Sequence, residues 1–232
     1  MGEQRKIAAI FDFDGTLFKG HFWSGLVKHH VRHKVKLPQV SVYIITHIFL
    51  WLVSKFKMLS EETYKVKWGE DLAILLKGFS KEEGLKIFRW INSNYVLKSL
   101  RSDVMALVQR HRNQGHIIIL LSGSFTDFLE TVKQRLGANY VVGTKLEVRN
   151  NSYTGRIVRP LCYGTNKARL LKEFISQTRL NIDLGLSFAY ADSIVDAPVL
   201  ETVGNPVATY PDKELLNLAQ RRGWRILPHP AG

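Results

Sequence analysis

The run Ile7–Phe11 is continuously apolar and ends in Asp12–Thr16, which reads Asp-Phe-Asp-Gly-Thr. A short apolar run that stops at polar residues and a glycine predicts a buried strand of an open α/β sheet. Ligands of such sheets bind beyond the carboxyl ends of the strands. Two carboxylates one residue apart repel each other there unless a cation or a shared proton intervenes. The pattern favours a divalent metal with oxygen ligands and a carboxylate that acts as nucleophile or general acid/base, and a plain helix cap is the alternative.

Two later segments supply groups that hold phosphate. The apolar run Ile117–Leu121 ends in Ser122 and Gly123, where a hydroxyl and backbone N–H groups can form an oxyanion cradle. The helical stretch that opens at Gly164 carries Lys167, whose ammonium can neutralise a bound phosphate and an attacking carboxylate together. Both segments therefore fit a metal-assisted attack on phosphate.

A third apolar run, Phe188–Ala191, leads into Asp192, with Asp196 four positions later. These two acids can complete a hard-cation site with the first motif. In order, the segments resemble the haloacid dehalogenase-like hydrolase superfamily, whose motifs are a DxD pair, a Ser/Thr at a strand end, a Lys and a terminal acidic pair.

The resemblance implies a role for each acid. Asp12 would be the nucleophile that forms an aspartyl-phosphate, and also a metal ligand. Asp14 would be the general acid/base, with its backbone carbonyl on the metal. Asp192 would bind Mg²⁺ directly, and Asp196 would bind it directly or through water.

The resemblance also implies that Ser122 and Gly123 hold the phosphoryl oxygens and that Lys167 offsets their charge. The function expected is a Mg²⁺-dependent hydrolase of phosphomonoesters that acts on a small phosphorylated metabolite. One alternative is a phosphotransferase that uses the same aspartyl-phosphate. Another is a non-catalytic basic module that binds nucleic acid or an anionic membrane. The sequence contains no RNA-recognition motif, finger or aromatic-basic repeat, so we expect no specific nucleic-acid partner.

The interval between the first two motifs is far longer than a strand crossover needs, and its amphipathic pattern predicts a chain of helices. The fold expected is therefore α/β, with a Rossmann-like doubly wound parallel sheet core and an inserted all-helical cap domain of the C1 type. The core would comprise residues 1–17 and 101–232, and the cap residues 18–100. The cap helices are expected at 22–35, 38–57, 61–77 and 81–98.

Within the superfamily the chain resembles subfamily IB, the phosphoserine phosphatase-like branch, in its helical cap and in the Ser-Gly-x-Phe motif at Ser122–Phe125. Two positions depart from that branch. His21 stands where a glutamate can pair with the substrate's ammonium group, and Val195 replaces an amide. We therefore expect a related phosphatase with a different preferred substrate, for which His21 and Trp23 are the candidate selectivity residues.

Charge and cysteine content constrain the setting. The chain has 33 Lys and Arg against 20 Asp and Glu, a formal charge of +13, which attracts phosphorylated substrates. Its single cysteine, Cys162, cannot form an internal disulfide, and the first six residues carry no secretory signal. We expect a cytoplasmic location, while no feature of the sequence indicates the oligomeric state.

Val40–Val53 is unusually apolar for a cap helix. Its 14 positions fall short of the ~20 needed to cross a bilayer. We expect this helix to be buried in the cap, and a peripheral membrane contact through residues 38–57 is the alternative.

Overall fold

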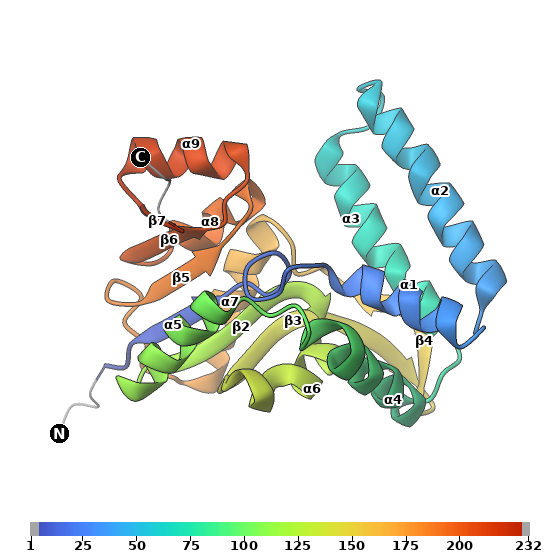
Figure 1. Ribbon diagram of the computed structural model, residues 1–232, viewed down its shortest axis with the longest axis horizontal. Helices are drawn as coiled ribbons and strands as arrows, with labels where there is room; N and C mark the ends of the chain where they lie inside the picture. The colour runs from blue at the N-terminus through green and yellow to red at the C-terminus, as the bar shows by residue number, and fades with distance from the viewer. Residues whose placement is uncertain (1–4, 229–232) are drawn as a thin grey trace.

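The computed structural model describes residues 5–228, which form a seven-stranded sheet with helices on both faces (Figure 1). Residues 1–4, on which part of the expected lack of a secretory signal depends, lie outside this range. The strand order is β4-β3-β2-β1-β5-β6-β7, and all neighbours pair in parallel except the antiparallel hairpin of β3 and β4. The α/β doubly wound class is therefore confirmed. The strands are β1 (Ala8–Phe11), β2 (Ile117–Phe125), β3 (Tyr140–Arg149), β4 (Ser152–Val158), β5 (Phe188–Ala191), β6 (Asn205–Thr209) and β7 (Arg225–Leu227).

Alternation along β1 divides the core into two layers. Ala9 and Phe11 belong to one hydrophobic cluster, with α5 and α6, whereas Ala8 and Ile10 belong to the other, with α7, α8 and α9. Both faces of the central strands are buried, which explains their continuously apolar sequences. The flanking helices are α5 (Ser102–Asn113), α6 (Thr126–Leu136), α7 (Thr165–Thr178), α8 (Ala197–Leu200) and α9 (Lys213–Arg222).

The segment between β1 and β2 is helical, as predicted. Ser60 and Ser80 are N-caps, and Ser80 forms a reciprocal capping box with Glu83. The last predicted helices end earlier than expected, because a 3₁₀ turn and a π turn follow them. The elements are α1 (Phe22–Arg32), α2 (Leu37–Lys55), α3 (Glu61–Asp71), the 3₁₀ turn Leu72–Leu76, α4 (Lys81–Ile91) and the π turn Asn92–Val96.

The inserted helices share their hydrophobic core with the sheet domain. Phe22 of α1 stacks on Phe128 of α6 with ring centroids 4.2 Å apart, and Phe88 of α4 packs edge-on against the same ring at 6.1 Å. The two parts are therefore not packed separately. We propose the division into a core (1–17 and 101–232) and a cap (18–100) as a division of function.

Helix α2 corrects an expectation. Within the described residues it buries only Val40, Tyr43 and His47, and its outer side is exposed, so the prediction of a buried helix is wrong. Its 19 residues also make it long and apolar enough to cross a membrane by length and composition. Hydropathy alone could not distinguish an apolar helix inside a bundle from one on its outside. In Figure 1, α2 and α3 form a hairpin that stands away from the sheet.

Candidate active site

The loop after β1 directs two carboxylates toward the same side. The N–H of Asp12 donates to the carbonyl of Tyr190 on β5, at 2.9 Å, so the loop leaves the sheet in a fixed direction. Phe13 points into the core, where its ring packs near Phe18 and Phe128 with centroids 5.6 and 5.7 Å away. With Phe13 anchored inside, its neighbours Asp12 and Asp14 extend beyond the carboxyl end of the strand.

Gly15 and Thr16 bring the first and last motifs together. Gly15 has φ +86°, and a Cβ at this position would stand 2.1 Å from Oδ2 of Asp192. Glycine is therefore required both by the backbone and by the approach of Asp192. The fully buried hydroxyl of Thr16 lies 3.0 Å from Oδ2 of Asp12 and 3.0 Å from Oδ1 of Asp192, and so links the two carboxylates.

Lys167, in the first turn of α7, is the cation of the site. Its Nζ lies 2.6 Å from Oδ1 of Asp12 and 2.8 Å from Oδ1 of Asp196, and all three side chains are buried. Burial works against the charged ammonium, but the two carboxylates outweigh it and raise the pKa of Lys167. The ammonium is therefore charged throughout the physiological range.

Asp12, Asp192 and Asp196 form a cluster whose carboxylate oxygens lie within 4.8 Å of one another. Burial raises the pKa of Asp12 to about 7, with Lys167 opposing, and raises the pKa values of Asp192 and Asp196 to about 6. Three carboxylates face one ammonium, so negative charge is in excess. Hard oxygen donors in that number fit a divalent cation such as Mg²⁺.

Asp14 belongs to the same loop but has different partners. Its Oδ1 accepts from the backbone N–H of Phe22 at 2.6 Å, and its Oδ2 accepts from the hydroxyls of Ser124 at 2.6 Å and Ser122 at 3.4 Å. Burial raises the pKa of Asp14 although these hydrogen bonds lower it. A raised pKa keeps a carboxyl group protonated to higher pH and makes its carboxylate a stronger base, which suits a group that both gives and takes a proton.

The last residues of β2, after Leu121, are held in place by a buried threonine. Thr144 of β3 donates its hydroxyl to the carbonyl of Gly123 at 2.8 Å and accepts from the N–H of Cys162 at 3.1 Å. A Cβ at Gly123 would stand 3.4 Å from the Cys162 carbonyl oxygen, in van der Waals contact with it. Ser122 and Gly123 are thereby held at the rim of the same cavity as Asp12.

All the residues singled out from the sequence line one cavity of about 410 Å³. The core contributes the catalytic candidates, and the start of the cap contributes His21, the N-cap of α1, and Trp23 of α1. Val195 also lies on the wall. The structure thus brings the nine predicted residues together, while their roles stay predictions. The nine are Asp12, Asp14, His21, Trp23, Ser122, Gly123, Lys167, Asp192 and Asp196.

Several supporting residues of the site were not predicted from the sequence. Asp212, the N-cap of α9, accepts from the Ser193 hydroxyl at 2.8 Å and from the Ile194 N–H at 2.9 Å, and so fixes the loop between Asp192 and Asp196. Arg101 donates to the carbonyl of Gly15 at 3.1 Å. The capping pattern was visible for Asp212, but no local signal places Arg101 beside the first motif.

Comparison with known proteins agrees with this geometry. The sequence model described as haloacid dehalogenase-like hydrolase matches residues 9–201. A phosphoserine phosphatase of Mycobacterium tuberculosis is 31% identical over 94% of this chain and 70% of its own. A probable phosphatase of the same organism is 32% identical over 96% of this chain and 75% of its own. A Bordetella pertussis protein of unknown function superimposes with TM-score 0.81 at 21% identity, over 96% and 98% of the two chains.

Proposed function

The chain belongs to the haloacid dehalogenase-like hydrolase family and is a phosphatase of the phosphoserine phosphatase-like kind, and from this premise we propose a Mg²⁺-dependent phosphomonoesterase that works through an aspartyl-phosphate on Asp12. The observation that carries the proposal is the position of Asp12, which pairs with Lys167 inside a cluster of three carboxylates, of which those of Asp12 and Asp196 are buried. A site that only binds phosphate has no need of three carboxylates beside it.

In the first step Asp12 attacks phosphorus and the ester oxygen leaves. Lys167 offsets the charge shared by Asp12 and the phosphoryl group, and Ser122 with the N–H of Gly123 holds the remaining oxygens. Asp12, Asp192 and Asp196 would hold the cation, which supplies further neutralisation of that charge. The alcohol leaves with a proton from Asp14, whose raised pKa favours the protonated form.

In the second step water attacks the phosphorus of the aspartyl-phosphate and Asp12 is released as the carboxylate. Asp14, now ionised, takes the proton of that water. Its hydrogen bonds to Ser124 and to the N–H of Phe22 hold the carboxyl group at the cavity wall in both steps. Because Phe22 begins α1, the position of Asp14 depends on the cap helix.

The walls of the cavity indicate the chemical class of the alcohol. The cap side is mainly apolar, and its polar side chains include His21 and Lys65. Among the described lining residues, the carboxylates all come from the core. Two nearby cap acids are already paired, Glu61 with Lys65 and Glu70 with Arg159, at 2.7 Å each. We propose that the substrate is a phosphate monoester whose alcohol part is uncharged and presents apolar surface. The apolar and aromatic wall residues include Phe22, Trp23, Tyr64, Trp68, Leu72, Phe125 and Leu161.

Phosphoserine is expected to be a poor substrate, with kcat/KM roughly thirtyfold below that of an apolar phosphomonoester. A neutral imidazole at His21 offers an ammonium group at most one hydrogen bond, and a protonated one repels it. The measurement is the initial rate of inorganic phosphate release, with Mg²⁺ and no added acceptor, from a panel of phosphate esters. Release without an acceptor also separates a hydrolase from a phosphotransferase.

A negative charge at position 21 should supply the missing contact with the ammonium group of phosphoserine. His21→Glu is expected to raise the rate on phosphoserine relative to the uncharged esters. His33→Glu is the matched control, because His33 is an exposed histidine that directly follows α1. If wild-type enzyme prefers phosphoserine over the whole panel, the selectivity argument from His21 is wrong.

A cytoplasmic location remains a prediction.

A further inference from the structure

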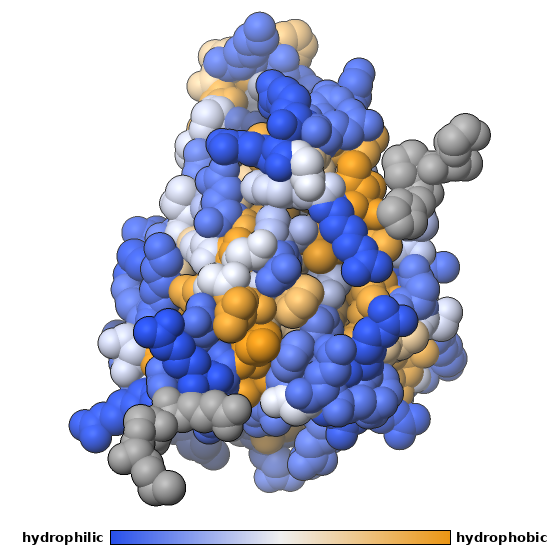
Figure 2. Space-filling view, turned by 90° about the vertical axis from the view of Figure 1, so that its left-hand side faces the viewer, coloured by the Kyte–Doolittle hydropathy of each residue, from blue (hydrophilic) through white to orange (hydrophobic). Residues whose placement is uncertain are grey.

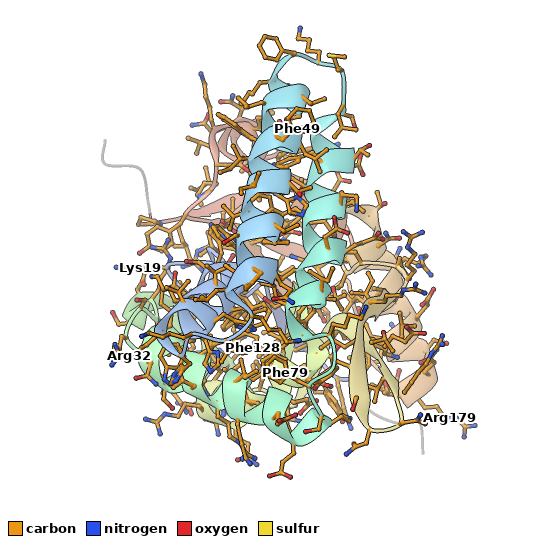
Figure 3. All side chains as sticks on the ribbon, turned by 90° about the vertical axis from the view of Figure 1, so that its right-hand side faces the viewer. Lys19, Arg32, Phe49, Phe79, Phe128 and Arg179 are labelled. Carbon is orange, nitrogen blue, oxygen red and sulfur yellow. The ribbon has the colours of Figure 1, made fainter. Side chains whose placement is uncertain are left out.

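The outer face of α2 is apolar and uncovered in the described part of the chain. Exposed side chains recur at spacings of three and four residues, from Val42 (64% exposed) through Ile45 (67%) and Phe49 (63%). Residues Leu37–Ser54 contain no charged side chain. Only 17% of the most apolar 18-residue stretch of the helix is buried. Figure 3 views the molecule with α2 and α3 toward the reader and marks Phe49 in the upper half of α2. Further exposed apolar residues on the helix and the loop after it are Ile48, Trp51, Leu52, Phe56 and Met58.

This apolar helix has basic side chains at both ends. Arg32 and Lys34 are exposed just before it, and Lys55 and Lys57 are exposed where it ends. No Asp or Glu occurs between His21 and Glu61. By contrast, the side of the molecule away from α2 is mostly hydrophilic, with apolar residues in patches among polar ones (Figure 2).

We propose that the outer face of α2 docks on a lipid bilayer that carries anionic headgroups. An apolar helix face enters the boundary between headgroups and acyl chains, while lysines beside it bind lipid phosphates. The exposed stripe and its two basic ends have this arrangement. The inference goes beyond the proposed phosphatase chemistry and does not depend on it.

A second copy of the chain is the other occupant that the stripe would fit. In a parallel pair of α2 helices, Lys55 and Lys57 would meet their own copies, and in an antiparallel pair they would meet Lys34. Helix pairs usually place opposite charges beside the apolar seam, and α2 has no acid to supply them. Charge complementarity therefore favours an anionic surface over self-association.

The contacts between α2 and α3 favour docking on the bilayer rather than crossing it. Tyr43 donates its hydroxyl to the Trp68 carbonyl at 3.1 Å, and Nε2 of His47 lies 3.5 Å from Asp71. Insertion of α2 across the membrane would either break these contacts or carry the charged helix α3 into hydrocarbon, which is costly. Since α3 also lines the catalytic cavity through Trp68 and Gly69, the cavity lies one helix layer behind the docked face.

The test is co-sedimentation of the full chain with vesicles of phosphatidylcholine alone and of phosphatidylcholine with phosphatidylglycerol. We expect binding to the anionic vesicles, weakened by salt. Replacing Ile45 and Phe49 together with glutamate should lower the partition coefficient at least about tenfold. Leu186→Glu is the matched control, since Leu186 is 56% exposed and lies outside α2, and it should bind like wild type.

Lys55→Gln with Lys57→Gln should lower the preference for anionic vesicles by roughly fivefold for each lysine. Hydrolysis of a soluble aryl phosphate by every variant reports an intact fold. Failure of wild type to bind anionic vesicles at low salt would overturn the proposal. Binding by the Ile45→Glu/Phe49→Glu variant equal to that of wild type would also overturn it. A dimer in sedimentation velocity that this variant dissociates would overturn it as well, because the face would then belong to a second copy.

Discussion

Asp12→Asn should lower kcat by at least about 10³-fold while the protein stays folded. The amide has nearly the same shape as the carboxylate but cannot attack phosphorus. The fold should tolerate the change because Asp12 belongs to a cluster with excess negative charge, and Lys167 keeps its contact with Asp196. Steady-state kinetics on an aryl phosphate, with the thermal midpoint as a measure of folding, checks both parts of the expectation.

Asp183→Asn provides the matched control for this substitution. Asp183 pairs with Arg5 at 3.2 Å near the opposite end of β1, so its loss should leave kcat unchanged. Activity of Asp12→Asn within tenfold of wild type would rule out Asp12 as the nucleophile.

Removal of Mg²⁺ should abolish turnover, and Mg²⁺ should restore it, whereas Ca²⁺ should bind but support little activity. Ca²⁺ accepts more ligands at longer distances, and so places Asp12 less well for in-line attack. The same cluster predicts that Mg²⁺ stabilises the fold, by about 2.7 kcal/mol at a hundredfold excess over Kd.

This stabilisation should depend on pH. The pKa values of Asp12, Asp192 and Asp196, raised by burial to about 7, 6 and 6, lie above those of the unfolded chain. As the pH falls toward 5, the folded protein without metal takes up protons that the unfolded chain does not, and so gains stability. Mg²⁺ must compete with those protons. The rise in Tm on adding Mg²⁺ should therefore be larger at pH 7.5 than at pH 5.5.

Differential scanning fluorimetry at the two pH values measures this effect. Asp192→Asn should reduce the Mg²⁺-induced rise in Tm. Full turnover after exhaustive chelation, or a rise in Tm that is the same at both pH values, would contradict the assigned metal site.

The sequence allowed the positions of the main site residues to be predicted because each follows an apolar strand or opens a helix. Parallel strands place their carboxyl ends at one edge of the sheet, so Asp12, Ser122 and Asp192 had to meet once β2, β1 and β5 were neighbours. Predicting that they share a cavity required no knowledge of side-chain packing.

Other contacts depend on packing that no local pattern encodes. Ser124 binds Asp14 only because β2 continues beyond its apolar run to Phe125. Arg101 reaches the Gly15 carbonyl across 86 positions of sequence. The prediction that α2 is buried was wrong because an apolar sequence suits both a buried helix and a helix on a membrane. Only the elements packed against the helix determine which of the two it is.

The central claim is that Asp12 carries the phosphoryl group during turnover. The most direct measurement uses the Asp14→Asn variant with an aryl phosphate whose leaving group needs no proton. The first step should then proceed, while the second lacks its general base. Acid quenching followed by mass spectrometry of the peptide that contains Asp12 should find an acyl-phosphate that hydroxylamine removes, absent when Asp12 is also replaced by Asn. Phosphate release by this variant with no covalent phosphate on that peptide would contradict the account.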